Sequence, residues 1–125
     1  MVTKQIKVII AGGRDFNDYD LLERSVDRML SKLFDTHAIT IVSGGARGAD
    51  ALAIQYANNR SDDVELLVMR ADWDTHGKSA GYKRNAEMAE VATHLIAFHD
   101  GQSRGTQHMI DLAIKMNLKT CIITY

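Results

Sequence analysis

The stretch Ile39-Thr40-Ile41-Val42-Ser43-Gly44-Gly45-Ala46-Arg47-Gly48-Ala49-Asp50 decides the fold of this chain. Its apolar beginning predicts a buried strand, and its two adjacent glycines predict a tight turn whose backbone can approach a ligand without a Cβ in the way. Apolar residues then recur at helical spacing up to Ala57, which predicts a helix that starts near Arg47. A strand, a glycine turn and a helix N-terminus together favour phosphate or carboxylate, because the first-turn N–H groups are free and the helix dipole is positive there.

This motif has a second interpretation, a strand-to-helix turn that binds nothing. Its spacing matches neither G-x-G-x-x-G nor a Walker A loop, so neither standard dinucleotide chemistry nor P-loop chemistry follows from it. The loops that follow the other predicted strands distinguish the two interpretations.

Composition predicts one globular domain that spans residues 1–125, since 46% of the residues are hydrophobic and 25% are charged. The net charge of −1 argues against a protein that coats nucleic acid through bulk electrostatics. The single cysteine, Cys121, lies in an apolar run and is predicted to be a buried strand residue, with no disulfide framework or zinc cluster. No stretch approaches the roughly 18 apolar residues of a membrane span and no signal peptide is visible, so we expect a soluble, cytoplasmic protein.

Strands and helices alternate along the chain. The apolar runs that predict strands are 6–10, 39–42, 64–69, 93–98 and 119–124. Between them we expect four helices, of which the first is capped by Asp20 and the last two span 82–90 and 106–117, and a polar loop at 70–80. Continuous apolar strands that alternate with helices predict an α/β fold: a Rossmann-like, doubly wound parallel sheet of order 3-2-1-4-5 with helices on both faces.

Four polar or glycine-rich loops each follow a predicted strand: 12–14, 43–45, 72–79 and 101–106. The carboxyl ends of parallel strands meet at one edge of the sheet, and ligands of such sheets bind outside that edge. The sequence therefore predicts one binding site built from all four loops.

The candidate site residues fall into groups by chemistry. Glycines and hydroxyl residues are assigned to phosphate and ribose binding; they are Gly12, Gly13, Ser43, Gly44, Gly45, Ser103, Gly105 and Thr106. Cationic side chains suited to phosphate are Arg14, Arg47, Lys78, Arg84 and Arg104. The remaining candidates are Asp15 and Asp50 as hydrogen-bond acceptors, Trp73 for stacking or for a structural contact, and Asn85 for the ligand or for local capping. His76 and His99 fall in site loops, but no spacing supports a metal site, and we expect no bound metal and no cofactor.

Several of these residues carry a resemblance to known families. Residues 43–50 resemble the Ser-Gly-x-Ala-Arg-Gly-x-Asp stretch of the DNA-processing protein A (Smf) family, and Arg84-Asn85 is similar to an Arg-Asn pair that follows in it. Residues 101–106 resemble the Gly-Thr turn of the lonely-guy phosphoribohydrolases. The resemblance that covers the whole chain in the right order is to the small stand-alone SLOG proteins of the YspA type. It is carried by residues 12–16, Trp73, Gly81, Arg84-Asn85 and 103–106.

The resemblance implies binding of nucleotides or nucleotide-derived ligands, often by a homodimer, and fixes no reaction. The lonely-guy enzymes use an arginine, which Arg84 matches, and a glutamate three residues past the threonine of the Gly-Thr turn. Here that position is Met109, which can neither stabilise an oxocarbenium-like centre nor accept a proton from water. If the chain hydrolyses N-glycosidic bonds, a carboxylate elsewhere must act, with Asp15 and Asp72 as the first candidates.

Two function classes therefore remain open. The first is a binding module for a nucleotide, a dinucleotide or an ADP-ribose-like molecule, acting as a sensor or sink. The second is a nucleotide-processing hydrolase with a relocated carboxylate. Single-stranded DNA binding is a weaker alternative, because the net charge of −1 and the 6% aromatic content do not favour it, and we do not expect nucleic acid or a membrane as a partner. Methionines in the last two predicted helices favour a homodimer, although they also suit core packing.

Overall fold

The computed structural model describes residues 4–125, and within them five strands and five α-helices follow one another. In chain order they are β1 (Lys4–Gly12), α1 (Tyr19–Leu30), β2 (His37–Ser43), α2 (Ala49–Asn59), β3 (Val64–Val68), α3 (Trp73–His76), α4 (Ala80–Val91), β4 (His94–His99), α5 (Arg104–Lys115) and β5 (Lys119–Thr124). Two short 3-10 turns, η1 (Ser31–Leu33) and η2 (Gly77–Ser79), follow α1 and α3.

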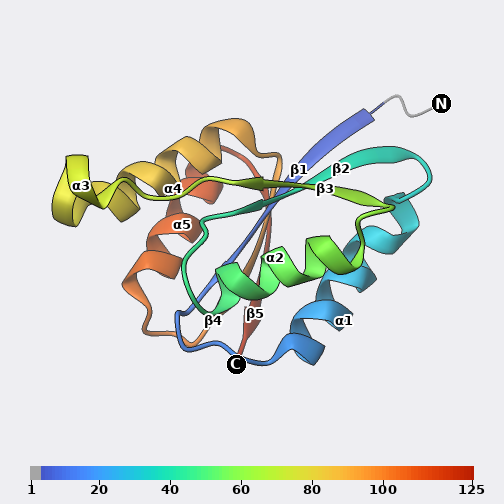
Figure 1. The fold of residues 1–125 in the computed structure, drawn as a ribbon, viewed down its shortest axis with the longest axis horizontal. Helices are drawn as coiled ribbons and strands as arrows, with labels where there is room; N and C mark the ends of the chain where they lie inside the picture. The colour runs from blue at the N-terminus through green and yellow to red at the C-terminus, as the bar shows by residue number, and fades with distance from the viewer. Residues whose placement is uncertain (1–3) are drawn as a thin grey trace.

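All strand pairs are parallel, and the sheet order is β3-β2-β1-β4-β5. This confirms the predicted doubly wound sheet and its order. Figure 1 shows α1 and α2 on one side of the sheet and α4 and α5 on the other.

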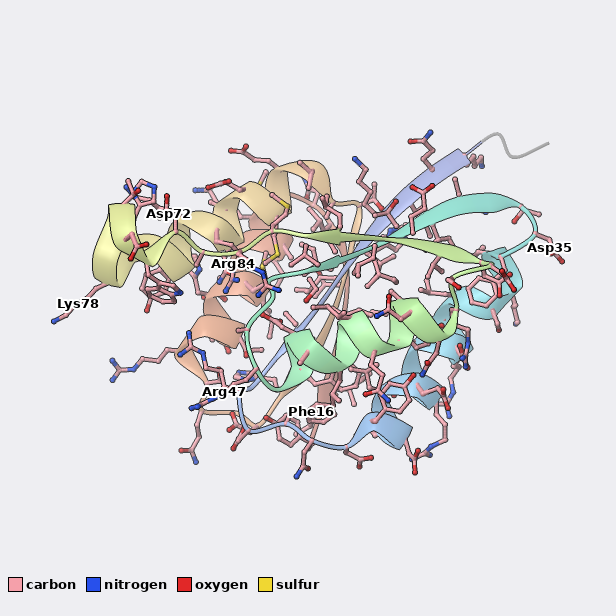
Figure 2. All side chains as sticks on the ribbon, in the orientation of Figure 1. Phe16, Asp35, Arg47, Asp72, Lys78 and Arg84 are labelled. Atoms are coloured by element: carbon pink, nitrogen blue, oxygen red, sulfur yellow. The ribbon has the colours of Figure 1, made fainter. Side chains whose placement is uncertain are left out.

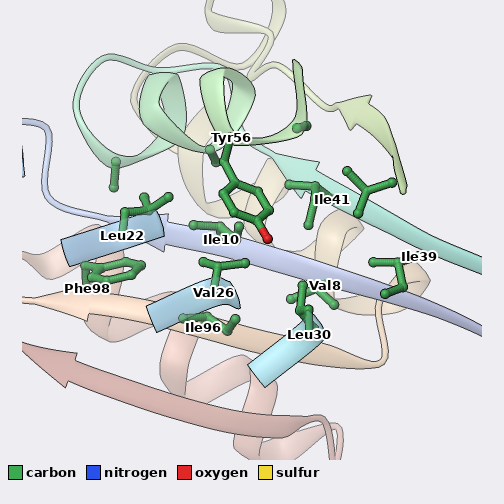
Figure 3. Close-up of a cluster of buried hydrophobic side chains, with 14 of the residues drawn as sticks. Val8, Ile10, Leu22, Val26, Leu30, Ile39, Ile41, Tyr56, Ile96 and Phe98 are labelled. Carbon is green, nitrogen blue, oxygen red and sulfur yellow. The ribbon is translucent and has the colours of Figure 1, made fainter. Parts of the chain in front are cut away.

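The side chains of β1 alternate between the two faces, as the period of two requires. Val8 and Ile10 point toward α1 and α2, whereas Ile9 and Ala11 point toward α4 and α5. On the first face Tyr56 of α2 is fully buried among these side chains (Figure 3). Its hydroxyl donates a hydrogen bond of 2.6 Å to Asp27 of α1, so the two helices are tied together where they cover the sheet.

Three details differ from the sequence-based prediction. The cap of α1 is Asp18, whose carboxylate accepts from the N–H of Leu21 at 3.0 Å, and Asp20 lies one residue inside the helix. The segment 70–80 is not a plain loop, because Asp72 caps the short helix α3 and the 3-10 turn η2 follows it. Cys121 is only partly buried, since β5 is an edge strand.

The carboxyl ends of the strands form the edge where the site is expected. β1 and β4 are neighbours at the centre of the sheet, and the chain leaves them toward opposite faces, into α1 and α5. Figure 1 shows α3 projecting beyond the sheet next to α4. Within residues 4–125 no helix has the length and apolar character to cross a membrane.

Candidate functional site

A pocket of about 260 Å³ lies at the carboxyl edge of the sheet. Four segments that are far apart in the sequence line it, and the predicted loop 43–45 is not among them. From the end of β1 and the start of α2 come Gly12, Arg14 and Asp50. From the α3–α4 region come Trp73, Lys78, Arg84 and Asn85, and from the start of α5 come Ser103, Gly105 and Thr106. We call this space the main pocket.

Arg84 is the best-anchored cation of the main pocket. Its Nη1 donates to the carbonyl oxygen of Gly44 at 2.6 Å, and its Nε donates to Oδ1 of Asn85 at 3.1 Å. Burial lowers the pKa of the guanidinium, and the nearby carboxylate of Asp50 opposes that shift. Figure 2 shows Arg84 between α4 and the loop that follows β2. Its Nη2 has no hydrogen-bond partner within residues 4–125, so this nitrogen is available to a ligand.

Asn85 holds Arg84 and α5 in place. Besides accepting from Arg84, it donates through Nδ2 to the carbonyl oxygen of Gly105 at 3.3 Å, and Nδ1 of His108 lies 3.1 Å away. Since both ends of this buried amide are occupied, Asn85 positions its neighbours.

Among residues 4–125, Asp50 is the one carboxylate that lines the main pocket. Only 8% of the residue is exposed, and its Oδ2 accepts from the N–H of Ala46 at 3.2 Å. Burial raises the pKa of this carboxyl group, although the charge of Arg84 and the Ala46 N–H act in the other direction.

The other candidate carboxylates have structural partners instead. Asp15 accepts a hydrogen bond of 3.1 Å from the hydroxyl of Tyr125. Asp72 caps α3 through a bond of 3.1 Å from the N–H of Thr75, and this bond lowers the pKa of its carboxyl group. Neither residue lines the main pocket.

The N-terminus of α5 opens into the main pocket. Ser103 caps the helix, with its Oγ accepting from the N–H of Thr106 at 3.3 Å. The amides of Arg104 and Gly105 have no hydrogen-bond partner among the described residues, and a Cβ built on Gly105 would meet open space. These first-turn amides can therefore receive an anion.

The start of α2, in contrast, is partly occupied by the protein itself. The N–H of Ala49 donates to the carbonyl oxygen of Gly13 at 3.2 Å, and that of Ala46 is bonded to Asp50. Ser43 is fully buried, and its Oγ donates to the backbone oxygen of Asp50 at 2.8 Å. The amides of Ala46 and Ala49 thus serve the turn, whereas those of Asp50 and Ala51 in the first turn of α2 have no hydrogen-bond partner among the described residues.

Gly44 and Gly45 make room for arginines. A Cβ on Gly44 would lie 2.3 Å from Nη1 of Arg84, and a Cβ on Gly45 would lie 2.8 Å from Nη1 of Arg70. Both glycines line a second pocket of about 160 Å³, which we call the arginine pocket because Arg14, Arg70 and Arg84 line it. It shares Arg14, Trp73 and Arg84 with the main pocket.

Besides Asp15 and Asp72, four of the candidates lie outside both pockets: Gly13, Ser43, Arg47 and Arg104. Arg70 and Tyr82 were not predicted as site residues from the sequence. Arg70 lies two residues after the end of β3, so the rule that loops after parallel strands meet at one edge of the sheet applies to it as well. Tyr82 was placed in its helix without a role, yet it lines the main pocket. The histidines of the site loops have separate neighbours: His76 lies 3.3 Å from Nζ of Lys83, and His99 lies 3.1 Å from Oε1 of Gln107.

Solved structures share this architecture. The fold is similar to that of DNA processing protein A from Helicobacter pylori, a protein with a single-stranded DNA binding mode, with a TM-score of 0.68 and 20% identity. The match covers 94% of this chain and 64% of that chain, so this chain spans less than two thirds of the solved one. At this identity the likeness shows the fold alone, and our expectation that nucleic acid is not a partner gains no support from it.

Sequence comparison gives the family. A curated relative, the Gene 61 protein of Mycobacterium phage D29, is 34% identical over 120 residues, which cover 90% of this chain and 91% of the relative. A family model described as YspA, cpYpsA-related SLOG matches residues 6–76, which include most of β1, the glycine loop (residues 43–45) and α3. The chain therefore belongs to the YspA, cpYpsA-related SLOG family.

Proposed function

We propose that the main pocket binds a phosphorylated nucleoside. One observation carries this proposal: three cationic side chains, the open N-terminus of a 12-residue helix and two half-exposed aromatic rings meet around one cavity. Each of these features suits a different part of a nucleotide.

The phosphate would bind where positive charge gathers. Arg14, Lys78 and Arg84 all line the main pocket, and Gly105, whose amide is free, lines it too. Guanidinium groups present paired N–H donors that match phosphate oxygens, and a helix N-terminus adds its partial positive charge.

The base would stack on an aromatic ring. Trp73 is 50% exposed and Tyr82 is 48% exposed, although both line the pocket. Arg14 lies over the ring of Trp73 at 5.8 Å, so this indole is already placed beside a cation that can bind phosphate. The carboxylate of Asp50 suits the ribose, because it accepts hydrogen bonds from hydroxyl groups.

We further propose that the protein acts as a cytoplasmic homodimer, as a sensor or sink for such a molecule. ADP-ribose-like and dinucleotide ligands belong to the same class, since each contains a phosphorylated nucleoside. The family and the pocket support this class of ligand, and they do not distinguish between the individual molecules in it.

Titration calorimetry with nucleoside monophosphates tests the proposal. Arg84→Ala should weaken binding tenfold to hundredfold, the equivalent of about 1.5–3 kcal/mol for a lost charged hydrogen bond. The matched control is Arg28→Ala, an exposed arginine in the last turn of α1, outside both pockets. Unchanged affinity in Arg84→Ala, or equal losses in both variants, would contradict the assignment.

Hydrolysis is the second candidate function, and the position of Asp50 favours it. A buried carboxylate with a raised pKa beside an arginine can accept a proton from water while the water oxygen bonds to C1′ of the ribose. The bond from C1′ to the base nitrogen breaks, and the base leaves with the proton that Asp50 took from the water. Chromatography that shows enzyme-dependent release of free base, abolished in Asp50→Asn, would establish this function; intact nucleotides after incubation would exclude it.

A further inference from the structure

The arginine pocket is an unusual concentration of positive charge. It opens beside the main pocket, and its wall is made by three arginines together with the glycine loop. Within residues 4–125 the ion pairs closer than 4 Å involve Arg60 and His99 and none of these three arginines. The pocket therefore holds guanidinium groups that no carboxylate in the described part of the chain neutralises at contact distance.

This arrangement favours an anion. Arg14 and Arg84 repel each other, and the nearby charge of Arg14 adds to burial in lowering the pKa of Arg84. Asp50 partly compensates Arg84, but it lines the main pocket and not the arginine pocket. A chain that keeps like charges together around a cavity gains stability when an anion enters it.

The glycine loop fixes the direction of two of these groups. Nη1 of Arg84 donates to the carbonyl oxygen of Gly44 at 2.6 Å, and Nη1 of Arg70 donates to that of Gly45 at 2.7 Å. The side chains occupy the space that a Cβ would fill at each glycine, and Gly45 has a φ of +74° that favours glycine. One edge of each guanidinium is thereby held by the backbone, and its other N–H groups remain for a ligand.

We propose that the arginine pocket binds a second phosphoryl group of the ligand whose nucleoside and first phosphate occupy the main pocket. The two pockets share Arg14, Trp73 and Arg84, so one molecule can extend from one into the other. The ligand class is then a nucleoside diphosphate or an ester of one, rather than a nucleoside monophosphate. This inference rests on the proposed function of the main pocket.

The test compares the monophosphate and the diphosphate of the same nucleoside, for each of the four common bases, by titration calorimetry. In the parent protein the diphosphate should bind at least about tenfold more tightly than the monophosphate, the equivalent of about 1.4 kcal/mol. Arg70→Gln should remove most of this gain and leave the monophosphate affinity unchanged, because Arg70 lines only the arginine pocket. Arg28→Gln, which removes the same charge from the far end of α1, should change neither affinity.

Each outcome separates the two proposals. If monophosphates bind but diphosphates gain nothing, or if Arg70→Gln weakens both ligands equally, the second phosphoryl site is wrong and the main pocket stands. If no nucleotide binds, the proposed function fails and this inference fails with it. Arg70→Lys is the control for a misfolded loop. It keeps the charge, so it should retain part of the tighter binding of the diphosphate. Complete loss of that tighter binding with an unchanged melting temperature would contradict the role of charge at this position.

Discussion

Gly44→Ala is the substitution that tests most closely how the site is built. A Cβ at this position would lie 2.3 Å from Nη1 of Arg84 and 2.7 Å from Oδ2 of Asp50, both closer than real Cβ contacts. The φ of Gly44 is not in the left-handed region, so the backbone itself tolerates alanine. The expected effect is therefore the displacement of the Arg84 side chain.

The magnitude follows from the bond that is lost. The hydrogen bond of 2.6 Å from Arg84 to the Gly44 carbonyl involves a charged donor and is worth about 1.5–3 kcal/mol. Replacing glycine by alanine returns about 0.4–1 kcal/mol, because the unfolded chain loses freedom. We expect a net loss of about 1–2 kcal/mol in the free energy of unfolding and a loss of at least about tenfold in nucleotide affinity.

Urea unfolding of a double-mutant cycle measures this. In the Arg84→Ala background the clash with the guanidinium is absent, so Gly44→Ala should cost less than half of what it costs in the parent. Gly81→Ala is the control, since its Cβ would meet only Trp73, at an ordinary 3.6 Å, within helix α4. Equal costs of Gly44→Ala in both backgrounds would refute the idea that this glycine exists to admit Arg84.

Three further outcomes are expected. Burial raises the pKa of Asp50 above its ordinary 3.8, so the folded state binds this proton more tightly than the unfolded chain does, and stability falls as pH rises past 3.8. Asp50→Asn should therefore become more stable relative to the parent as the pH of urea titrations is raised above that value. A difference in stability that does not change with pH would contradict the burial argument. Trp73→Ala should weaken nucleotide binding by about 1–3 kcal/mol while leaving the melting temperature unchanged, because the ring is half exposed; unaltered affinity would exclude stacking. The homodimer hypothesis fails if sedimentation equilibrium at micromolar concentration shows only a 13.9 kDa species.

Sequence reasoning succeeded where pattern and topology dictate the answer. Apolar strands that alternate with helices predict a parallel sheet with helices on both faces. The order 3-2-1-4-5, chosen because it puts a switch point between the first and fourth strands, is confirmed. Arg84 and Trp73 were found because each lies in or beside a loop that follows a predicted strand.

The errors came from contacts between distant segments. Gly44 and Gly45 indicated a close backbone approach, but the sequence does not state that the approaching groups are Arg84 and Arg70, which come from elements 25 to 40 residues away. Asp15 and Asp72 have carboxyl groups that could act in catalysis. In the structure, however, Asp15 accepts a hydrogen bond from Tyr125, and Asp72 accepts one from the first turn of α3. Asp18 and Asp20 both fit a helix start, and the structure shows Asp18 as the cap.

The most direct test of the central claim is a titration of the isotopically labelled 13.9 kDa chain with nucleoside mono- and diphosphates, followed by amide chemical shifts in NMR spectra. We expect saturable shifts that centre on the amides of Gly12, Arg14, Arg84 and Gly105, which line the main pocket, and none at the far end of α1. Shifts that centre on another surface, or no saturable shift with any nucleotide up to millimolar concentration, would contradict the claim that this pocket binds a phosphorylated nucleoside.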